Sequence, residues 1–126
     1  MKGLILIAHC SKRSLSNNEF LDLVSEVENK DKKFAKIEAA FLEFATPNIN
    51  TVVKTFIENG IREIYFYPYF LNSGKHVSVD LPNIINKLKE DYPLMEFRLL
   101  SHFGKSNKIS NIIIEDISSY LKDGES

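Results

Sequence analysis

The sequence predicts an α/β fold: a single doubly wound domain with a four-stranded parallel sheet and helices on both faces. Short apolar stretches alternate with longer segments whose apolar residues recur every three or four positions, a pattern typical of strands alternating with helices. The two most apolar stretches, residues 4–8 and 64–67, lack a helical period and are typical of strands covered on both faces. With 126 residues the chain is long enough for one core, so we expect residues 1–126 to form one domain.

The first half of the chain contains two predicted strands and two predicted helices. Residues 2–8 form the first strand, and a helix begins near Ser16, which has capping-box spacing with Glu19. Residues 35–42 form the second strand, whose charged positions predict a sheet edge. The second helix is expected to begin at Thr46–Pro47, as an N-cap followed by proline in the first turn.

The second half of the chain repeats this alternation. Residues 63–67 form the third strand, which Pro68 ends because proline has no N–H to donate to the ladder. Asp80 is the predicted N-cap of the third helix. Residues 96–100 form the fourth strand, and Arg98 within it again indicates an edge. Because the first and third strands are the most apolar, we expect them to be central, which gives the strand order 2-1-3-4.

The fourth helix is predicted to begin near Asn107 and to turn an apolar face toward the core. Residues 122–126 form an expected frayed tail. This helix completes the alternation of four strands with four helices. Its predicted inward face consists of Ile109, Ile112, Ile113, Ile117, Tyr120 and Leu121.

Composition excludes several classes of function. The formal net charge is −1, so no overall field attracts nucleic acid or an anionic membrane. Cys10 is the single cysteine, which excludes an internal disulfide and is typical of a reducing compartment. The apolar run at residues 4–8 is too short for a signal peptide or a membrane span. We therefore expect a cytoplasmic protein with no nucleic-acid partner and no membrane partner.

All three histidines follow directly after predicted strands. His9 follows the first strand, His76 comes after the turn of the third, and His102 follows the fourth, while Glu43 follows the second. The carboxyl ends of parallel strands meet at one edge of the sheet, where open α/β folds bind their ligands. Imidazole exchanges protons near neutral pH and binds divalent metals such as cobalt, nickel and iron. His9 and His76 are therefore the main candidates for metal binding and catalysis, because the switch point lies between their strands.

The turn before His76 is small and polar. Gly74 allows a close approach of the backbone to a ligand, or a positive φ angle. Backbone N–H groups beside Lys75 would suit a carboxylate or a phosphate, although an ordinary solvated turn is the alternative. Tyr69 and Phe70 are close enough to this turn to line a flat apolar cavity.

At these residues the sequence resembles the short, single-domain sirohydrochlorin chelatases of the CbiX/SirB family. The matching segments are residues 4–11, 40–43, 68–77 and 80–82, and the agreement in order and spacing covers nearly the whole chain. The resemblance implies insertion of a divalent metal (Co²⁺, Fe²⁺ or Ni²⁺) into sirohydrochlorin, a carboxylate-rich tetrapyrrole, in cobalamin or sirohaem biosynthesis. It also implies a homodimer with no permanently bound cofactor, since the metal is a substrate.

The family's two catalytic histidines align with His9 and His76, so the resemblance implies that both hold the metal and accept protons. The chain has Cys10 where the family usually has glycine and His102 where it usually has proline, and these departures leave the choice of metal open. With Glu43 they are candidates for a further metal ligand or a proton relay. The residues expected to bind the tetrapyrrole are Ser11, Arg13, Tyr69, Phe70, Ser73, Gly74 and Lys75.

Two other functions stay open from the sequence. Mannose-type sugar-transport phosphocarriers use a histidine after the first strand as a phosphohistidine, but this interpretation gives His76 no role. A non-catalytic carrier of metal or tetrapyrrole would use the same residues as a chelatase. Histidine phosphatases require an arginine where the chain has Ala8, and a receiver domain requires an acidic pair after the first strand, so both are disfavoured.

Overall fold

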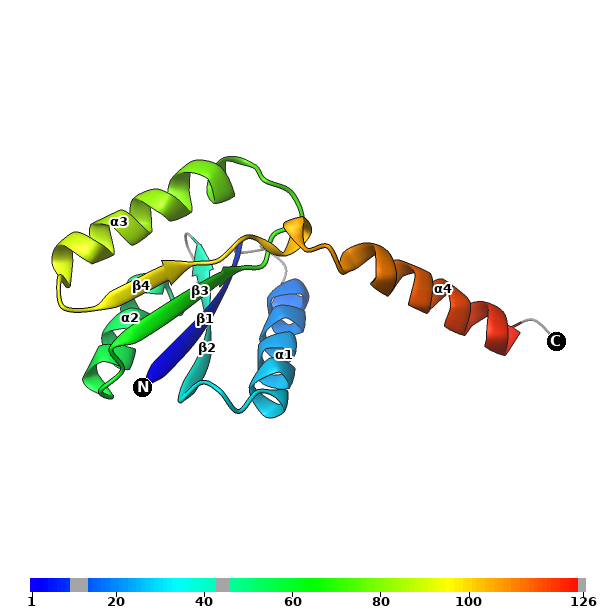
Figure 1. The fold of residues 1–126 in the computed structure, drawn as a ribbon, viewed down its shortest axis with the longest axis horizontal. Coiled ribbons are helices and arrows are strands. Elements are labelled where there is room, and N and C mark those ends of the chain that lie inside the picture. The colour runs from blue at the N-terminus through cyan, green and yellow to red at the C-terminus, as the bar shows by residue number, and fades with distance from the viewer. Residues whose placement is uncertain (10–13, 43–45, 125–126) are drawn as a thin grey trace.

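The structure, a computed structural model, describes residues 1–9, 14–42 and 46–124 (Figure 1). Four of the predicted site residues, Cys10, Ser11, Arg13 and Glu43, lie outside these ranges. The strands are β1 (Lys2–His9), β2 (Lys36–Leu42), β3 (Glu63–Pro68) and β4 (Glu96–Leu99). The helices are α1 (Ser14–Lys30), α2 (Ile49–Glu58), α3 (Leu81–Asp91) and α4 (Ile109–Gly124), with a π-helical turn η1 (His76–Asp80) and a 3₁₀ turn η2 (Phe103–Lys105).

The four strands form one parallel sheet in the order β2-β1-β3-β4, which confirms the predicted topology. Leu6 in the middle of β1 is opposite Ala39 of β2 and Tyr67 of β3. Pro68 is the last residue of β3, one residue beyond the predicted end, and lies opposite Ile7. The ladder tolerates this proline because the next N–H, that of Tyr69, donates to the Ile7 carbonyl at 2.7 Å.

Helices cover both faces of the sheet, as predicted, because successive side chains of each strand point to opposite faces. On one face Ile5 and Ile7 of β1 pack with residues of α2 and α3. On the other face Leu4 and Leu6 pack with residues of α1, and the side chain of Phe20 is buried there. The sheet therefore separates two apolar clusters, which we name the α2–α3 side and the α1 side. Among the described residues, no helix combines the length and apolar character needed to cross a membrane.

The starts of α1 and α2 differ from the prediction. Helix α1 begins at Ser14, before the predicted capping box at Ser16. Helix α2 begins after Asn48, whose Oδ1 accepts a hydrogen bond from the N–H of Thr51 at 2.9 Å. Asn48 is therefore the N-cap in place of Thr46–Pro47, which lies in the preceding loop and contains a cis peptide bond. The Asn48 side chain satisfies one of the first backbone donors of α2, a role for which Thr46 also had suitable chemistry.

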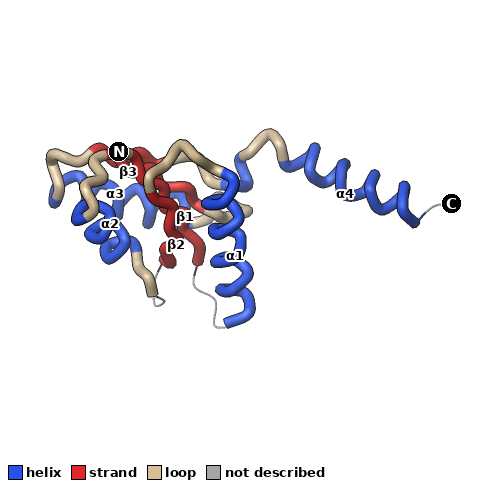
Figure 2. The backbone as a smooth tube through the Cα atoms, turned by 90° about the horizontal axis from the view of Figure 1, so that it is seen from below, coloured by secondary structure: helices blue, strands red, loops and turns tan. Residues whose placement is uncertain are grey.

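The prediction for the fourth helix was wrong in its packing. Helix α4 forms, but it extends away from the sheet and from the other helices in two perpendicular views (Figures 1 and 2). The helix continues to Gly124, so residues 122–124 are helical where a frayed tail was expected. Its apolar face is exposed to solvent, with Ile113 52% and Ile117 50% accessible. A helical period identifies an apolar face but does not say which surface that face will meet.

Because α4 projects outward, part of the α1 side has no helix over it. A groove of about 250 Å³ lies there, beside α1 and over β1 and β3. We name it the α1-side groove; it is lined by Leu4, Leu6, Leu23, Val27, Tyr67, Tyr69 and Phe103.

Candidate functional site

The side chains of His9 and His76 lie next to each other at the carboxyl edge of the sheet. Their ring centroids are 4.8 Å apart and the ring planes are inclined by 38°. His9 is the last residue of β1, and His76 begins η1 after the turn that follows β3. Strands β1 and β3 are hydrogen-bonded neighbours, so the sheet itself brings the two rings together. His9 is exposed and His76 is partly exposed, which leaves the pair accessible to a ligand from solvent.

Asp80 supports His76 from one turn further along the chain. The Asp80 Oδ2 lies 2.8 Å from Nδ1 of His76. A carboxylate only accepts hydrogen bonds, so Nδ1 of His76 carries the proton and Nε2 keeps its lone pair in the neutral ring. Carboxylates in this position fix the tautomer and orientation of metal-binding histidines.

Asp80 was missed as a site residue because it was interpreted as an N-cap. The structure corrects this: the Asp80 backbone is already helical and its side chain makes no capping bond. The π-helical turn η1 runs directly into α3, so no free helix start exists there for Asp80 to cap. The signal that was available is the four-residue spacing from His76 to Asp80, which puts both side chains on one helical face.

Gly74 anchors the start of η1 through its carbonyl oxygen. This oxygen accepts hydrogen bonds from the N–H of Val77 at 3.1 Å and from both the N–H and the Oγ of Ser78 at 3.0 Å. The N–H of Leu81 donates to the carbonyl of His76, which closes the wider π-type ring. Backbone bonds on both sides of His76 therefore limit where its ring can lie.

The turn before His76 is exposed, as its polar sequence predicted. Ser73, Gly74 and Lys75 all lie at the surface. A Cβ atom added at Gly74 would meet no atom within 4 Å, so open space adjoins the backbone there. Gly74 does not have a positive φ angle, so backbone conformation does not explain the glycine, and the open space is compatible with a ligand or with solvent.

Tyr69 and Phe70 lie on opposite faces of the sheet. Phe70 packs against the α2–α3 side, with its ring centroid 6.2 Å from that of His76. Tyr69 lies on the α1 side, stacked on Phe20 with centroids 5.7 Å apart and planes 19° apart. Consecutive residues of extended backbone point in opposite directions, so Phe70 faces the α2–α3 side, where its ring lies near that of His76.

The turn after β4 packs against the segment that leads to His76. The N–H of Gly104 donates to the carbonyl of Phe70 at 2.9 Å, and a Cβ at Gly104 would overlap the carbonyl of Leu71. His102 immediately precedes η2, where its carbonyl accepts from the N–H of Lys105 at 3.0 Å. Within the described ranges no three or more His, Cys, Asp or Glu side chains form a group that could hold a metal, so His102 does not complete a site with His9 and His76.

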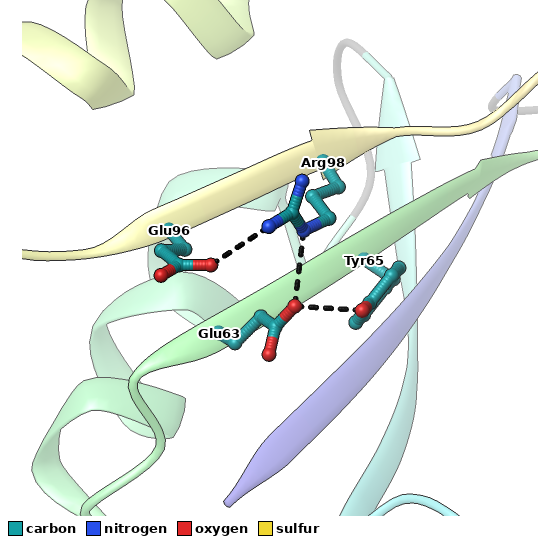
Figure 3. A network of polar contacts seen from close by, with 4 residues as sticks. All are labelled: Glu63, Tyr65, Glu96 and Arg98. Carbon is teal, nitrogen blue, oxygen red and sulfur yellow. Dashed lines mark hydrogen bonds and ion pairs between the residues drawn. The ribbon is translucent and has the colours of Figure 1, made fainter.

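Among the described residues, a network of polar contacts that shifts pKa values lies away from the histidines, on β3 and β4 (Figure 3). Glu63 accepts hydrogen bonds from the hydroxyl of Tyr65 at 2.6 Å and from Arg98 at 3.0 Å, and both bonds lower the pKa of the Glu63 carboxyl. The same bond to Glu63 raises the pKa of Tyr65. Arg98 also donates to Glu96 at 2.9 Å. Glu63 and Glu96 begin their strands, at the end of the sheet opposite to the histidines, so this network is structural.

The comparison with protein families agrees with this architecture. Residues 3–120 match the CbiX family. The chain belongs to the CbiX family. The Methanocaldococcus jannaschii protein named sirohydrochlorin cobaltochelatase is 29% identical to this CbiX chain over 92 residues, which are 73% of this chain and 64% of the relative. The Sulfurisphaera tokodaii protein of the same name is 26% identical over 123 residues, covering 97% of this chain and 96% of the relative.

Other relatives of this CbiX chain are longer than it is. The chloroplastic sirohydrochlorin ferrochelatase of Arabidopsis thaliana is 23% identical over 119 residues, and the matched region is 52% of its length. The match to the Methanocaldococcus jannaschii protein covers 64% of that relative, so the chain spans about half to two thirds of the length of several relatives.

Solved structures show the same fold. The CbiX protein from Marinobacter aquaeolei superposes with a TM-score of 0.84 at 24% identity, over 98% of this chain and 99% of that one. The cobalt complex of the sirohydrochlorin chelatase SirB from Bacillus subtilis gives a TM-score of 0.83 at 18% identity, over 94% of this chain and 50% of that one. These likenesses confirm the four-stranded parallel α/β fold.

Proposed function

We propose that this CbiX chain is a sirohydrochlorin chelatase, which inserts a divalent metal into a carboxylate-rich tetrapyrrole. The observation that carries the proposal is the contact between His9 and His76 at the carboxyl edge of the sheet. Membership of the CbiX family and relatives named cobaltochelatase and ferrochelatase support it. Co²⁺ is the first candidate metal, with Fe²⁺ and Ni²⁺ as alternatives, since imidazole suits all three.

The separation of the two rings fits a shared metal. A metal about 2.1 Å from one nitrogen of each ring, at a tetrahedral angle, places the ring centroids about 5 Å apart. The observed separation of His9 and His76 is 4.8 Å. Two protein ligands leave other coordination positions open to water or to pyrrole nitrogens, so the metal is held weakly enough to leave. That is the requirement for a metal that is a substrate of the reaction.

The same two imidazoles can accept the protons that metal insertion releases from the tetrapyrrole. Insertion of one divalent metal releases two pyrrole N–H protons, and the two imidazoles could accept one each as the metal leaves their nitrogens for those of the macrocycle. His76 suits this role because Asp80 bonds to its Nδ1 and leaves Nε2 available. In this arrangement Asp80 is a positioning residue, which stabilises the imidazolium that forms.

The surroundings of the pair suit a large, flat, anionic ligand. Ser73, Gly74 and Lys75 form an exposed turn whose backbone is unobstructed at Gly74 and whose lysine attracts carboxylates. Phe70 places an aromatic ring next to His76 on the α2–α3 side. We propose that these residues orient the macrocycle above the histidines, while binding of its carboxylates supplies most of the affinity.

We also propose that two copies pair around the tetrapyrrole. One sheet edge contacts only one side of a flat ring, and a symmetric pair encloses it. The chain matches half of the SirB chain, so two copies carry as much α/β structure as one SirB molecule. The single cysteine and near-zero net charge support a cytoplasmic location with no nucleic-acid partner.

The structure gives less support to the phosphocarrier alternative than the sequence does. A phosphohistidine at His9 needs room around its ring, yet His76 lies against it and is itself held by Asp80. A non-catalytic carrier differs from a chelatase only in turnover, so product formation distinguishes the two.

The test is an anaerobic assay of the purified protein with sirohydrochlorin and Co²⁺, Fe²⁺ or Ni²⁺ in turn, with insertion followed by absorbance. His9→Ala and His76→Ala should lose insertion, whereas His102→Ala is the matched control with a histidine outside the pair. Binding of sirohydrochlorin without metal is measured in parallel by fluorescence quenching. An insertion rate no higher than that of the protein-free reaction would reject the chelatase, and ring binding without turnover would indicate a carrier.

A further inference from the structure

The 3₁₀ turn η2 lies beside the segment that leads from β3 to His76, at the carboxyl edge of the sheet (Figure 1). The N–H of Gly104 donates to the carbonyl of Phe70 at 2.9 Å. The ring centroids of Phe103 and Tyr69 are 5.4 Å apart. Although β4 is an edge strand, these contacts bring the turn that follows it next to the chain that carries the histidine site.

Gly104 allows the two segments to come this close. A Cβ atom there would overlap the carbonyl of Leu71, so the two backbones are in direct contact. Within η2 the N–H of Lys105 donates to the carbonyl of His102 at 3.0 Å. The backbone of Lys105 is therefore held against the segment that precedes the turn at Ser73–Lys75, while its side chain is exposed to solvent.

The two segments that meet here contain positive charges and no negative ones. Of the 126 residues 17 are acidic, yet residues 64–79 and 97–114 contain neither aspartate nor glutamate. Asp80, which follows the first segment, is bonded to a histidine. Glu63 and Glu96 begin β3 and β4, at the opposite end of the sheet. The part of the carboxyl edge that these segments form is therefore basic, although the whole chain has a net charge of −1.

The lysines of the two turns are available to a ligand. Lys75 and Lys105 are exposed, and neither forms an ion pair with a carboxylate within the described part of the chain. Arg98, which lies in the same acid-free stretch, differs because it pairs with Glu63 at 3.0 Å. Two unpaired ammonium groups on adjoining turns favour a ligand that carries more than one carboxylate.

We propose that Lys105 binds a peripheral carboxylate of the tetrapyrrole and so makes η2 a second wall of the binding surface, in addition to the turn at Ser73–Lys75. A ring with carboxylates around its rim needs cations on more than one side, and η2 supplies one from a different strand. An ammonium group on a flexible stem can follow a carboxylate without a fixed geometry. The inference rests on the proposed function for the identity of the ring, and it gives Lys105 no part in the metal chemistry.

The first test is a titration of the full chain with metal-free sirohydrochlorin, followed by fluorescence quenching. Lys105→Gln should raise Kd about 3-fold to 10-fold at low ionic strength, and Lys105→Glu should raise it further because it repels the ring. At about 0.5 M salt the values for Lys105→Gln and wild type should converge, since salt screens an exposed charge. Lys89→Gln is the matched control, because Lys89 is an exposed lysine in the last turn of α3, near Glu96.

The second test separates ring binding from turnover. In steady-state insertion of Co²⁺, Lys105→Gln should raise KM for sirohydrochlorin and leave kcat unchanged, because the lost contact is the same in the ground state and the transition state. Lys105→Arg keeps the charge and should retain the wild-type affinity. Circular dichroism establishes that each variant is folded. An unchanged Kd in Lys105→Gln, an equal rise in Lys89→Gln, a rise that persists at high salt, or a wild type that does not bind the ring would each overturn the assignment.

The assignment of Lys105 and the chelatase proposal fail in different ways. Metal insertion by a wild type whose ring affinity does not depend on Lys105 would keep the chelatase and reject the assignment. Ring binding that depends on Lys105, without any metal insertion, would keep the assignment and reject the chelatase.

Discussion

The carboxylate of Asp80 is hydrogen-bonded to a ring nitrogen of His76, with Oδ2 and Nδ1 2.8 Å apart. Asp80 comes four positions after His76, and the π-helical turn η1 carries both side chains. The contact fixes the orientation of His76 through an element that is itself fixed by backbone bonds. It therefore gives the histidine pair a second layer of support that can be tested separately.

Asp80→Asn should lower the rate of metal insertion about 10-fold to 100-fold, because it removes the charge that orients and stabilises the His76 ring. Binding of sirohydrochlorin should not change, since Asp80 is not expected to contact the macrocycle. Insertion rate and ring affinity are measured side by side. Val79→Ala, at an exposed position of the same turn, is the control and should behave like wild type. A normal insertion rate in folded Asp80→Asn would show that the contact is only structural.

His9→Ala, His76→Ala and the double variant should lose similar amounts of insertion activity. If both rings hold one metal in the insertion step, removing either disrupts the same transition state, and the second removal adds little. The ring centroids of His9 and His76 are 4.8 Å apart, so we expect the effects of the two substitutions to be coupled. Insertion rates of the three variants provide the measurement, with His102→Ala as the reference. Losses that multiply in the double variant would indicate two independent roles.

The predictable part of this site came from topology. Strand apolarity gave the order 2-1-3-4, and that order placed His9 beside His76 because the carboxyl ends of neighbouring parallel strands meet. The contact of Asp80 with His76 was not predicted. An acidic residue before a helix is commonly an N-cap, and this interpretation gave the four-residue spacing from His76 no role. The packing of α4 could not be predicted, since its apolar stripe is compatible with a surface of the same chain or of another.

Two glycines near the site should respond in opposite ways to substitution by alanine. Gly104→Ala should destabilise the fold by about 1–3 kcal/mol, because the new methyl group overlaps the Leu71 carbonyl. Gly74→Ala should change the free energy of unfolding by no more than about 0.5 kcal/mol, since its surroundings are open, yet weaken sirohydrochlorin binding. Urea denaturation and ring titration measure the two effects. Unchanged ring affinity in Gly74→Ala would remove the turn from the proposed binding surface.

Stability in mild acid should depend on Glu63. Hydrogen bonds from Tyr65 and Arg98 hold the pKa of its carboxyl below the ordinary value of 4.5 in the folded state. Between the folded and unfolded pKa values the unfolded chain binds more protons, so the contribution of Glu63 is complete above pH 4.5 and is lost as the pH falls through the folded-state pKa.

Glu63→Gln should therefore flatten the pH dependence of the free energy of unfolding below about pH 4.5. Urea midpoints between about pH 3 and pH 6 provide the measurement. Glu90→Gln, an exposed carboxylate on α3, is the control and should retain the wild-type slope. An unchanged slope in Glu63→Gln would mean that the network of Figure 3 does not perturb Glu63 in solution.

The parallel pairing of β1 with β3 has a consequence for the newly made protein. His9 is near the start of the chain, while His76 follows β3, after two intervening helices and a strand have been made. Contacts between such distant segments form only after the chain has closed a long loop. A nascent or partly unfolded molecule therefore has no paired imidazoles with which to capture a scarce transition metal. Under the proposed function, metal acquisition would therefore be restricted to molecules that have completed their fold.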